Sequence, residues 1–349
     1  MAKKPWWKFT RRTFMAGMGA SGLALSLGGC DWLEATLKTA TDGSKPPVIW
    51  IQGASCTGCS ISLLNSVSPG IAEVLLDIID MRYHSNIMAA AGNLALAQID
   101  KVATEHEGEF FLVVEGSVPL GANGLYSTMG YRNDHGDVFG PAMNDSGVIT
   151  FVEAVTSLGK RAKAIIAAGT CATNGGIPAG RPNPTEAVGV DQVVKGTPII
   201  NIPNCPIHPD RFIGTLAYVL TYNSIPALDA HKRPKMFYAN RLHDKCHNKP
   251  FFEKGQFATK IGEEGCLYGL GCAGMIAMSD CSTRWWNNKV SWCVLSGAPC
   301  IGCSEPDFPD MTSPFFEEYI PFRGEKEREF LKKIDAARQQ KKGKGGVNG

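Results

Sequence analysis

A short apolar run that ends in two cysteines constrains this chain more than any other stretch. Residues 48–52 are mostly β-branched or aromatic, which is typical of a buried strand, and Gly53 ends the run. Cys56 and Cys59 follow at C-x2-C spacing. Thiolates at the carboxyl end of a strand lie where open α/β sheets bind their ligands, and they suit zinc, copper or iron–sulfur centres. A lone C-x2-C pair is equally typical of a redox dithiol or half a zinc site, so the other cysteines must decide.

Two further predicted strands in the first part of the chain also end at cysteines. Apolar runs predict strands over residues 110–116, 162–168 and 197–202, and helical apolar periods cover 69–80, 94–103 and 148–158. Strands that alternate with helices predict an α/β fold with a parallel, doubly wound sheet. Because the carboxyl ends of parallel strands meet at one edge, we expect four cysteines to converge there: Cys56, Cys59, Cys171 and Cys205.

The chain changes character after Arg211. A helix is predicted over residues 212–222, and beyond it glycine, proline, cysteine and aromatic residues follow with little periodicity. We therefore predict a domain boundary near residue 210, with the α/β domain over 47–210 and a loop-rich, mostly irregular domain over 211–322. We expect the second domain to be held together by something other than a large core.

The two ends of the chain carry its excess basic charge. The 349 residues have a formal net charge of +2, but residues 1–29 contain basic and no acidic side chains, and the tail 323–349 is basic, polar and glycine-rich. The body between them is net acidic. Nucleic-acid binding therefore finds no support, and the tail is predicted to be a solvated end rather than a transmembrane anchor.

The first thirty residues predict export. Arg11 and Arg12 form a twin-arginine pattern, and the apolar stretch after them is too short to span a bilayer comfortably. That stretch ends in Leu-Gly-Gly-Cys30, which resembles a bacterial lipobox with Cys30 as the lipidated residue. A signal cut elsewhere and a cytosolic basic segment are the alternatives. We expect residues 1–30 to be the signal, 31–46 a linker, and the mature protein to be lipid-anchored on the periplasmic side of the cytoplasmic membrane.

The cysteine count narrows the kind of metal site. Of twelve cysteines, Cys30 belongs to the signal, and the odd number left over argues against a framework of disulfides. Structural zinc sites usually draw their ligands from two close pairs, whereas Cys171 and Cys205 stand alone at separate strand ends. Iron–sulfur clusters are ligated in this way, and Cys205-Pro206 is similar to the Cys-Pro ending of ferredoxin motifs. We favour iron–sulfur clusters over zinc.

The second part of the chain supplies two more ligand groups. His243 precedes Cys246 at a spacing that favours a ligand over a surface histidine, and with Cys266 and Cys272 it can hold one cubane. The last group consists of Cys281, Cys293, Cys300 and Cys303.

These motifs resemble those of the small, electron-transferring subunit of nickel–iron hydrogenases. The similarity covers about residues 47–322, and its motifs are Cys-Thr-Gly-Cys-Ser, Gly-Thr-Cys171-Ala, Asn-Ile-Pro-Asn-Cys205-Pro, His-x2-Cys and Pro-Cys-Ile-Gly-Cys-Ser-Glu-Pro-Asp-Phe. The resemblance implies a flavodoxin-like first domain and three clusters. Their ligands by position are Cys56, Cys59, Cys171 and Cys205 for a proximal [4Fe–4S], His243, Cys246, Cys266 and Cys272 for a distal [4Fe–4S], and Cys281, Cys300 and Cys303 for a medial cluster.

Cys293 decides which medial cluster the resemblance implies. Many relatives have proline at this position and a [3Fe–4S] cluster, whereas a fourth thiolate allows a full [4Fe–4S] cluster. In this respect the chain resembles the nickel–iron–selenium branch, and the alternative is that Cys293 is a buried free thiol. Gly58 and Ala179 stand where oxygen-tolerant members carry extra cysteines, so their special proximal cluster is not expected.

The resemblance implies that this chain conducts electrons and has no catalytic residue of its own. Hydrogen would be activated at a nickel–iron site in a separate large subunit, and an external carrier, a multihaem c-type cytochrome, would exchange the electrons. Glu115 ends a predicted strand near the proximal ligands, and it is a candidate to support them or to serve as a helix cap or ion-pair partner. The alternatives are a structural zinc protein and the small subunit of a related quinone- or coenzyme-reducing complex, against which the export signal argues.

Overall fold

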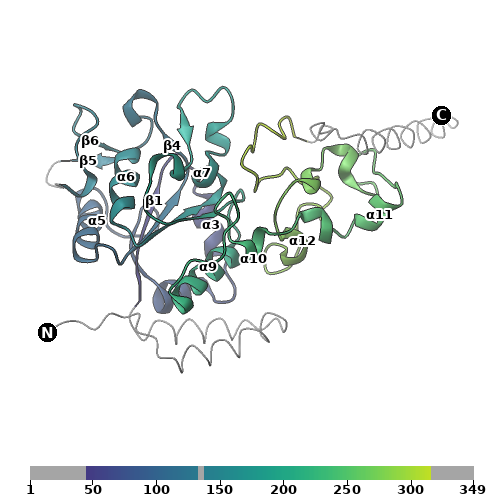
Figure 1. Cartoon of the computed structure of the whole chain (residues 1–349), viewed down its shortest axis with the longest axis horizontal. Coiled ribbons are helices and arrows are strands. Elements are labelled where there is room, and N and C mark those ends of the chain that lie inside the picture. The colour runs from purple at the N-terminus through teal and green to yellow at the C-terminus, as the bar shows by residue number, and fades with distance from the viewer. Residues whose placement is uncertain (1–44, 133–136, 316–349) are drawn as a thin grey trace. The chain divides into compact units, whose positions relative to one another are not determined.

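The computed structural model describes residues 45–132 and 137–315. The predicted signal, most of the linker and the basic tail lie outside the described residues, so the hypotheses on Arg11, Arg12 and Cys30 stay predictions. The chain forms two compact units that divide between Met236 and Phe237, and each is described by itself (Figure 1). Among the residues described, none of the helices is both long enough and apolar enough to cross a bilayer.

A five-stranded parallel sheet forms the centre of the first unit. Its strands are β1 (Pro47–Gln52), β2 (Asp80–His84), β3 (Phe111–Glu115), β7 (Ala164–Ala168) and β9 (Ile199–Ile202), in the order β2-β1-β3-β7-β9. This is the flavodoxin-like order, which reverses direction between β1 and β3. The predicted α/β class and parallel sheet are confirmed, and all four predicted strands are present.

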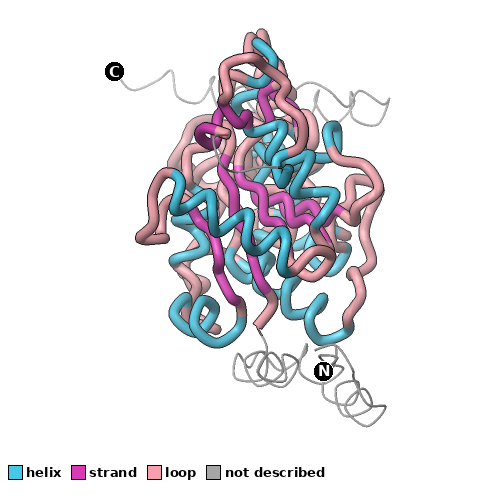
Figure 2. Tube along the Cα trace, turned by 90° about the vertical axis from the view of Figure 1, so that its left-hand side faces the viewer, coloured by secondary structure: helices cyan, strands magenta, loops and turns pink. Residues whose placement is uncertain are grey.

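Alternating residues of the strands pack into two apolar cores, one on each face of the sheet. On one face, Ile49, Leu112 and Ile165 pack with residues of α5 (Asn93–Glu105), α6 (Phe151–Arg161) and α8 (Val190–Val193). On the other face, Trp50, Val113 and Ile200 pack with α3 (Gly58–Leu64), α4 (Ile71–Glu73) continued by a π-helical turn (Val74–Ile78), and α9 (Pro209–Tyr222). Figure 2 shows helices running across the strands. Burial on both faces explains why the strands read as unbroken apolar runs.

Three differences from the sequence prediction have physical reasons. The edge strand β2 was not predicted, because its Asp80 and Arg82 form an ion pair and break the apolar run. The helix predicted from residue 148 starts at Phe151, since residues 148–150 form strand β6. The first unit continues to Met236 rather than ending near residue 210, because α9 buries Phe212, Ile213 and Leu216 against the sheet.

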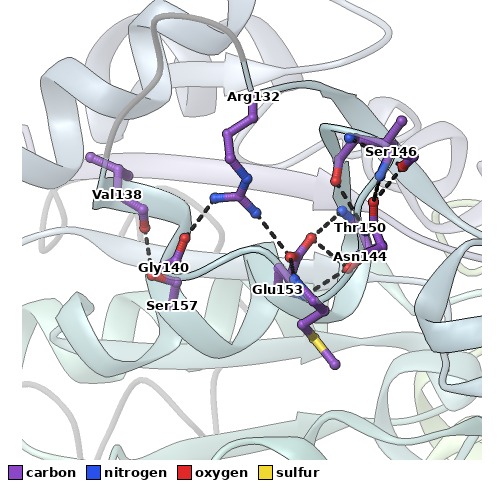
Figure 3. A network of polar contacts seen from close by, with 10 residues as sticks. Arg132, Val138, Gly140, Asn144, Ser146, Thr150, Glu153 and Ser157 are labelled. Atoms are coloured by element: carbon purple, nitrogen blue, oxygen red, sulfur yellow. Dashed lines mark hydrogen bonds and ion pairs between the residues drawn. The ribbon is translucent and has the colours of Figure 1, made fainter.

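A polar network ties the segment after β5 (Thr128–Tyr131) to the start of α6 (Figure 3). The buried Glu153 carboxylate accepts from Arg132 Nη2 at 2.9 Å and from the Thr150 backbone N–H at 2.6 Å, while Thr150 accepts in return from the Glu153 N–H. This reciprocal capping box fixes where the helix begins. Short strands β4 (Val118–Pro119) and β8 (Ala187–Val188) form an antiparallel pair, as do β5 and β6.

The second unit is built from single turns. After α10 (Lys235–Tyr238), which spans the division, come η5 (Leu242–Lys245), α11 (Lys249–Glu253), η6 (Leu267–Leu270), η7 (Ala273–Met275) and α12 (Cys281–Arg284). Its main buried cluster is small: Leu242, Ala258, Leu267, Ala277, Cys281, Trp292, Val294 and Cys300. The described residues of the second unit are mostly irregular, as the sequence predicted.

Candidate metal centres

The first unit brings four predicted ligands to the carboxyl edge of its sheet. Cys56 follows β1, and Cys59 lies in the first turn of α3. Cys171 lies in the first turn of α7 (Gly169–Asn174), directly after β7, and Cys205 follows β9. Because β1 borders the point where strand order reverses, these thiols lie where ligands bind in open α/β sheets.

Glycines make room for the sulfur atoms of these cysteines. A Cβ on Gly169, whose φ is +87°, would lie 2.4 Å from Cys59 Sγ, and one on Gly176 would lie 2.9 Å from Cys171 Sγ. A Cβ on Gly58 would lie 3.0 Å from Cys56 Sγ. The backbone of a glycine therefore lies directly against each of three thiols, those of Cys56, Cys59 and Cys171.

Glu115 organises the end of β3 beside this site. Its Oε1 accepts from the backbone N–H groups of Cys59 at 3.0 Å and Ser60 at 3.3 Å, which are otherwise unpaired at the start of α3. Its Oε2 accepts from Trp50 Nε1 and Gln52 Nε2, both at 3.0 Å. Of the roles considered from the sequence, the structure supports the helix cap. Glu115 is fully buried and reaches a candidate ligand through that ligand's backbone.

The surroundings of the thiols disfavour bare thiolates. Burial, followed by the charge of Glu115, raises the pKa of Cys59 well above its ordinary value, and burial raises the pKa of Cys171. The charges of Cys171 and Cys205 also raise the pKa of Cys59, and the charge of Cys56 raises the pKa of Cys171. The four thiols therefore interact electrostatically with one another. Iron is a positive centre that stabilises thiolates, and its binding would release the thiol protons.

The second unit gathers four more predicted ligands around one pocket. The residues come from three turns: His243 lies in η5 and Cys246 at its end, Cys266 lies at the start of η6, and Cys272 at the start of η7. Burial raises the pKa of Cys266 to about 12. Burial, followed by the charge of Lys249, lowers the pKa of His243, which keeps the imidazole neutral and able to bind a metal.

Aromatic rings hold the His243 side of this pocket. The His243 ring meets Phe252 edge-on with centroids 4.5 Å apart, and Phe252 meets Phe257 and Tyr268 in the same way at 5.9 and 6.0 Å. Edge-to-face contacts of this kind fix ring orientation. The imidazole is therefore oriented by packing.

The last four predicted ligands lie in the same unit. Cys281 begins α12 and accepts a hydrogen bond from, or donates one to, Ser279 Oγ at 3.1 Å. Cys281 and Cys300 are buried, and Cys303 is partly exposed. Cys293 is exposed as a residue, yet burial of its thiol, followed by the charge of Cys281, raises the pKa of Cys293.

The two ligand groups of the second unit are joined by backbone hydrogen bonds. The N–H of Cys300 donates to Cys272 Sγ at 3.3 Å, and the N–H of Ala273 donates to the Cys300 carbonyl at 2.7 Å. A second amide, that of Gly302, donates to Cys300 Sγ at 3.4 Å. Amide donors to sulfur are one of the means by which proteins set cluster potentials.

The geometry also bears on the alternatives to clusters. No disulfide links the cysteines in the described part of the chain. Within residues 45–132 and 137–315, no three His, Cys, Asp or Glu side chains come close enough to hold one metal ion, as structural zinc would require.

Sequence comparison gives the family. Residues 238–316 match the family described as the C-terminal part of the NiFe/NiFeSe hydrogenase small subunit. The chain is 38% identical to the periplasmic [NiFeSe] hydrogenase small subunit of Desulfomicrobium baculatum over 321 residues, covering 88% of this chain and 98% of the relative. The chain belongs to the hydrogenase small-subunit family. An uptake hydrogenase small subunit from Azotobacter vinelandii is 37% identical over 88% of this chain and 82% of that protein.

Solved hydrogenase structures agree with this assignment. The [NiFeSe] hydrogenase of Desulfomicrobium baculatum matches with a TM-score of 0.71 at 38% identity, covering 78% of this chain and 99% of that one. The recombinant [NiFeSe] hydrogenase of Desulfovibrio vulgaris Hildenborough also gives 0.71, at 39% identity over 79% and 98%. Residues 56–219 match the family described as NADH ubiquinone oxidoreductase, 20 Kd subunit. The first unit therefore matches a family named for a different oxidoreductase as well. The match of the second unit to the hydrogenase family distinguishes a hydrogenase subunit from that other oxidoreductase.

Sequence reasoning missed the residues that support the first ligand group. Thr170 and Asn204 join the ends of β7 and β9: the Asn204 N–H donates to Thr170 Oγ1 at 2.9 Å, and the Thr170 N–H donates to the Asn204 carbonyl at 3.1 Å. Ser60 Oγ lies 3.0 Å from His84 Nε2 and also donates to Glu115. The polar residue beside each cysteine was the available signal, but its partners lie far away in the sequence.

Proposed function

We propose that this member of the hydrogenase small-subunit family holds three iron–sulfur clusters, which pass electrons between the hydrogen-activating site of a large subunit and an external carrier. The proximal [4Fe–4S] cluster would bind Cys56, Cys59, Cys171 and Cys205. The distal [4Fe–4S] cluster would bind His243, Cys246, Cys266 and Cys272. The medial cluster would bind Cys281, Cys293, Cys300 and Cys303 as a [4Fe–4S] cluster, with [3Fe–4S] as the alternative if Cys293 does not ligate.

The observation that carries this proposal is the pocket of the second unit. Three thiols and one imidazole from three single turns, η5, η6 and η7, line the same pocket. Apart from Asn248, the side chains around them are apolar or aromatic, so little in the pocket would supply acid–base chemistry. Such a site suits electron transfer, in which the protein holds the cofactor and adjusts its potential.

The partner and the place of action come from the relatives. Relatives are named small subunits, and several are named periplasmic or uptake hydrogenases. We take the large subunit that this name implies as the partner and the periplasm as the compartment. Nickel and hydrogen chemistry belong to that partner, and no catalytic residue is assigned to this chain.

Replacement of His243 tests the electron-exit function. In the assembled enzyme, His243→Ala should slow hydrogen oxidation with an external acceptor at least about tenfold, because the exit cluster is lost or altered. Hydrogen–deuterium exchange needs no electron exit and should keep most of its wild-type rate. His247→Ala is the matched control, a histidine one position beyond Cys246. Equal losses of both activities in His243→Ala would contradict the proposal.

The external carrier is proposed to be a multihaem c-type cytochrome. The net acidic body of the chain would steer a basic carrier, so the rate should fall as salt is added. Charges beside His243 are of both signs and paired, with Arg241 3.3 Å from Asp244 and Lys249 3.9 Å from Glu253. Steering would thus act through the chain as a whole. A rate that is independent of salt would argue for a neutral carrier.

Anchoring is proposed to use Cys30 after twin-arginine export. One acyl chain binds membranes weakly, so stable anchoring requires the several chains of a bacterial lipoprotein. Cys30→Ala should release the protein from membranes or block its processing. An unmodified N-terminus in the wild type, measured by mass spectrometry, would refute lipidation and leave the electron-transfer proposal intact.

A further inference from the structure

One buried hydrogen-bond donor in the second unit has no acceptor in the described chain. The side chain of Trp292 is 3% exposed, and its indole Nε1 has no hydrogen-bond partner among the described residues. Buried N–H groups are almost always paired, and an exception points to a water, ion or cofactor that completes the site. A partner protein cannot supply the acceptor, because this chain's own residues already cover the ring.

Another tryptophan of the same apolar cluster shows the usual arrangement. Trp285 packs against the cluster that contains Trp292, and its indole N–H donates to the Ser282 carbonyl at 3.0 Å. The two indoles therefore share an environment and differ in whether a protein acceptor is present.

The neighbours of Trp292 indicate which acceptor is missing. Trp292 directly precedes Cys293 in the chain, and its buried cluster includes Cys281 and Cys300. Two proposed medial ligands are therefore buried members of its cluster and a third is its neighbour in the chain, whereas the distal candidates Cys246 and Cys272 are only partly buried and pack against that cluster. The His247 ring meets the Trp292 ring edge-on, with centroids 5.6 Å apart. His247 does not accept a hydrogen bond from Trp292 Nε1.

We propose that Trp292 Nε1–H donates a hydrogen bond to a sulfur of the medial cluster and raises its reduction potential. This inference rests on the proposed function, since it requires a cluster at Cys281, Cys293, Cys300 and Cys303. A donor to sulfur stabilises the added electron, because reduction increases the negative charge on the cluster core. Trp292 thereby tunes the middle step of the electron path without ligating iron.

Potentiometric EPR titration of Trp292→Phe in the assembled enzyme tests the proposal. The variant removes the donor and keeps an aromatic ring. At a fixed potential, the reduced-to-oxidised ratio of the medial cluster should fall about fivefold, which is about 40 mV for a one-electron couple. Trp285→Phe is the control and should leave the medial potential at the wild-type value. An unchanged medial potential in Trp292→Phe, or a shift confined to the distal cluster, would overturn the proposal.

A measurement on the unaltered protein covers the case in which Trp292→Phe does not assemble. In enzyme labelled with ¹⁵N at the indole nitrogen, pulsed EPR of the reduced medial cluster should show a ¹⁵N coupling that persists in Trp285→Phe. A fully loaded medial cluster without this coupling would refute the role of Trp292 alone. A protein without iron or sulfide would instead refute the proposed function.

Discussion

The two units place their candidate ligands by different means. In the first unit, Cys56, Cys171 and Cys205 follow strands whose side chains fill an apolar core on each face of the sheet. In the second unit, Cys246, Cys266 and Cys272 sit between single turns around a small buried cluster, and cysteines form part of that cluster. We therefore expect the first site to be preorganised by a fold that is stable without it, and the second unit to depend on its proposed sites for much of its interior.

Removal of the proposed clusters should produce the largest difference in stability between the two units. If iron is stripped anaerobically with an oxidant and a chelator, the second unit loses the groups that join its turns, and amides within residues 242–303 should exchange at least about tenfold faster. Amides of β3 and β7 should keep their protection, because their sheet is held by the apolar cores. Hydrogen-exchange mass spectrometry measures both regions in one sample. If β3 and β7 lost protection to the same extent as residues 242–303, the two units would not differ in their dependence on the clusters.

A single methyl group should disrupt the preorganised site. Gly169→Ala places a Cβ 2.4 Å from Cys59 Sγ, so the proximal cluster should be lost or loaded poorly. Gly196→Ala is a matched control: its φ is also +87°, but a Cβ there meets nothing within 4 Å. Both variants carry the backbone strain of about 1 kcal/mol, and only Gly169→Ala adds the clash. Iron content and the proximal EPR signal distinguish the two variants. Normal cluster loading in Gly169→Ala would contradict the claim that Gly169 makes room for the Cys59 sulfur.

Cys293 tests whether the second unit tolerates a change of cluster type. The wild type, handled without oxygen, should show no [3Fe–4S] signal in its oxidised state. Cys293→Pro should create one with a raised potential, because a thiolate that favours the oxidised core is lost. The rest of the second unit should remain folded, since Cys293 is exposed. A strong native [3Fe–4S] signal, unrelated to oxidative damage, would show that Cys293 is not a ligand.

The smallest expected effect is a pH dependence in the first unit. Burial, partly opposed by the charge of Glu115, lowers the pKa of His84, whose Nδ1 accepts from the Asn86 N–H at 3.2 Å. As the pH falls through about 6.5, the unfolded chain gains a proton that the folded chain resists, so the free energy of unfolding should fall. His84→Gln should reduce this loss of stability at acid pH, measured as the melting temperature of the first unit at a series of pH values. A loss identical to that of the wild type would exclude His84 as its source.

The sequence predicted the first unit better than the second for a physical reason. Residues 48–52 and 162–168 read as strands because burial on both faces requires an unbroken apolar run. Strand β2 was hidden because an edge strand tolerates Asp80 and Arg82. In the second unit, periodicity predicted no elements, and only the spacing of His243 and the cysteines was informative. The support by Glu115 and the unpaired donor of Trp292 arise from contacts between distant residues, which no local pattern records.

The pair of hydrogen bonds between Cys300 and the segment Cys272–Ala273 has a consequence for engineering. The Cys300 amide donates to the sulfur of a distal candidate ligand, while the Cys300 thiol belongs to the medial group. A substitution that moves this peptide would therefore alter the charge felt by both groups together. Two successive steps of an electron relay built on these ligands would share one adjustable element, and a library that selects for a changed potential at one step would carry a correlated change at the next.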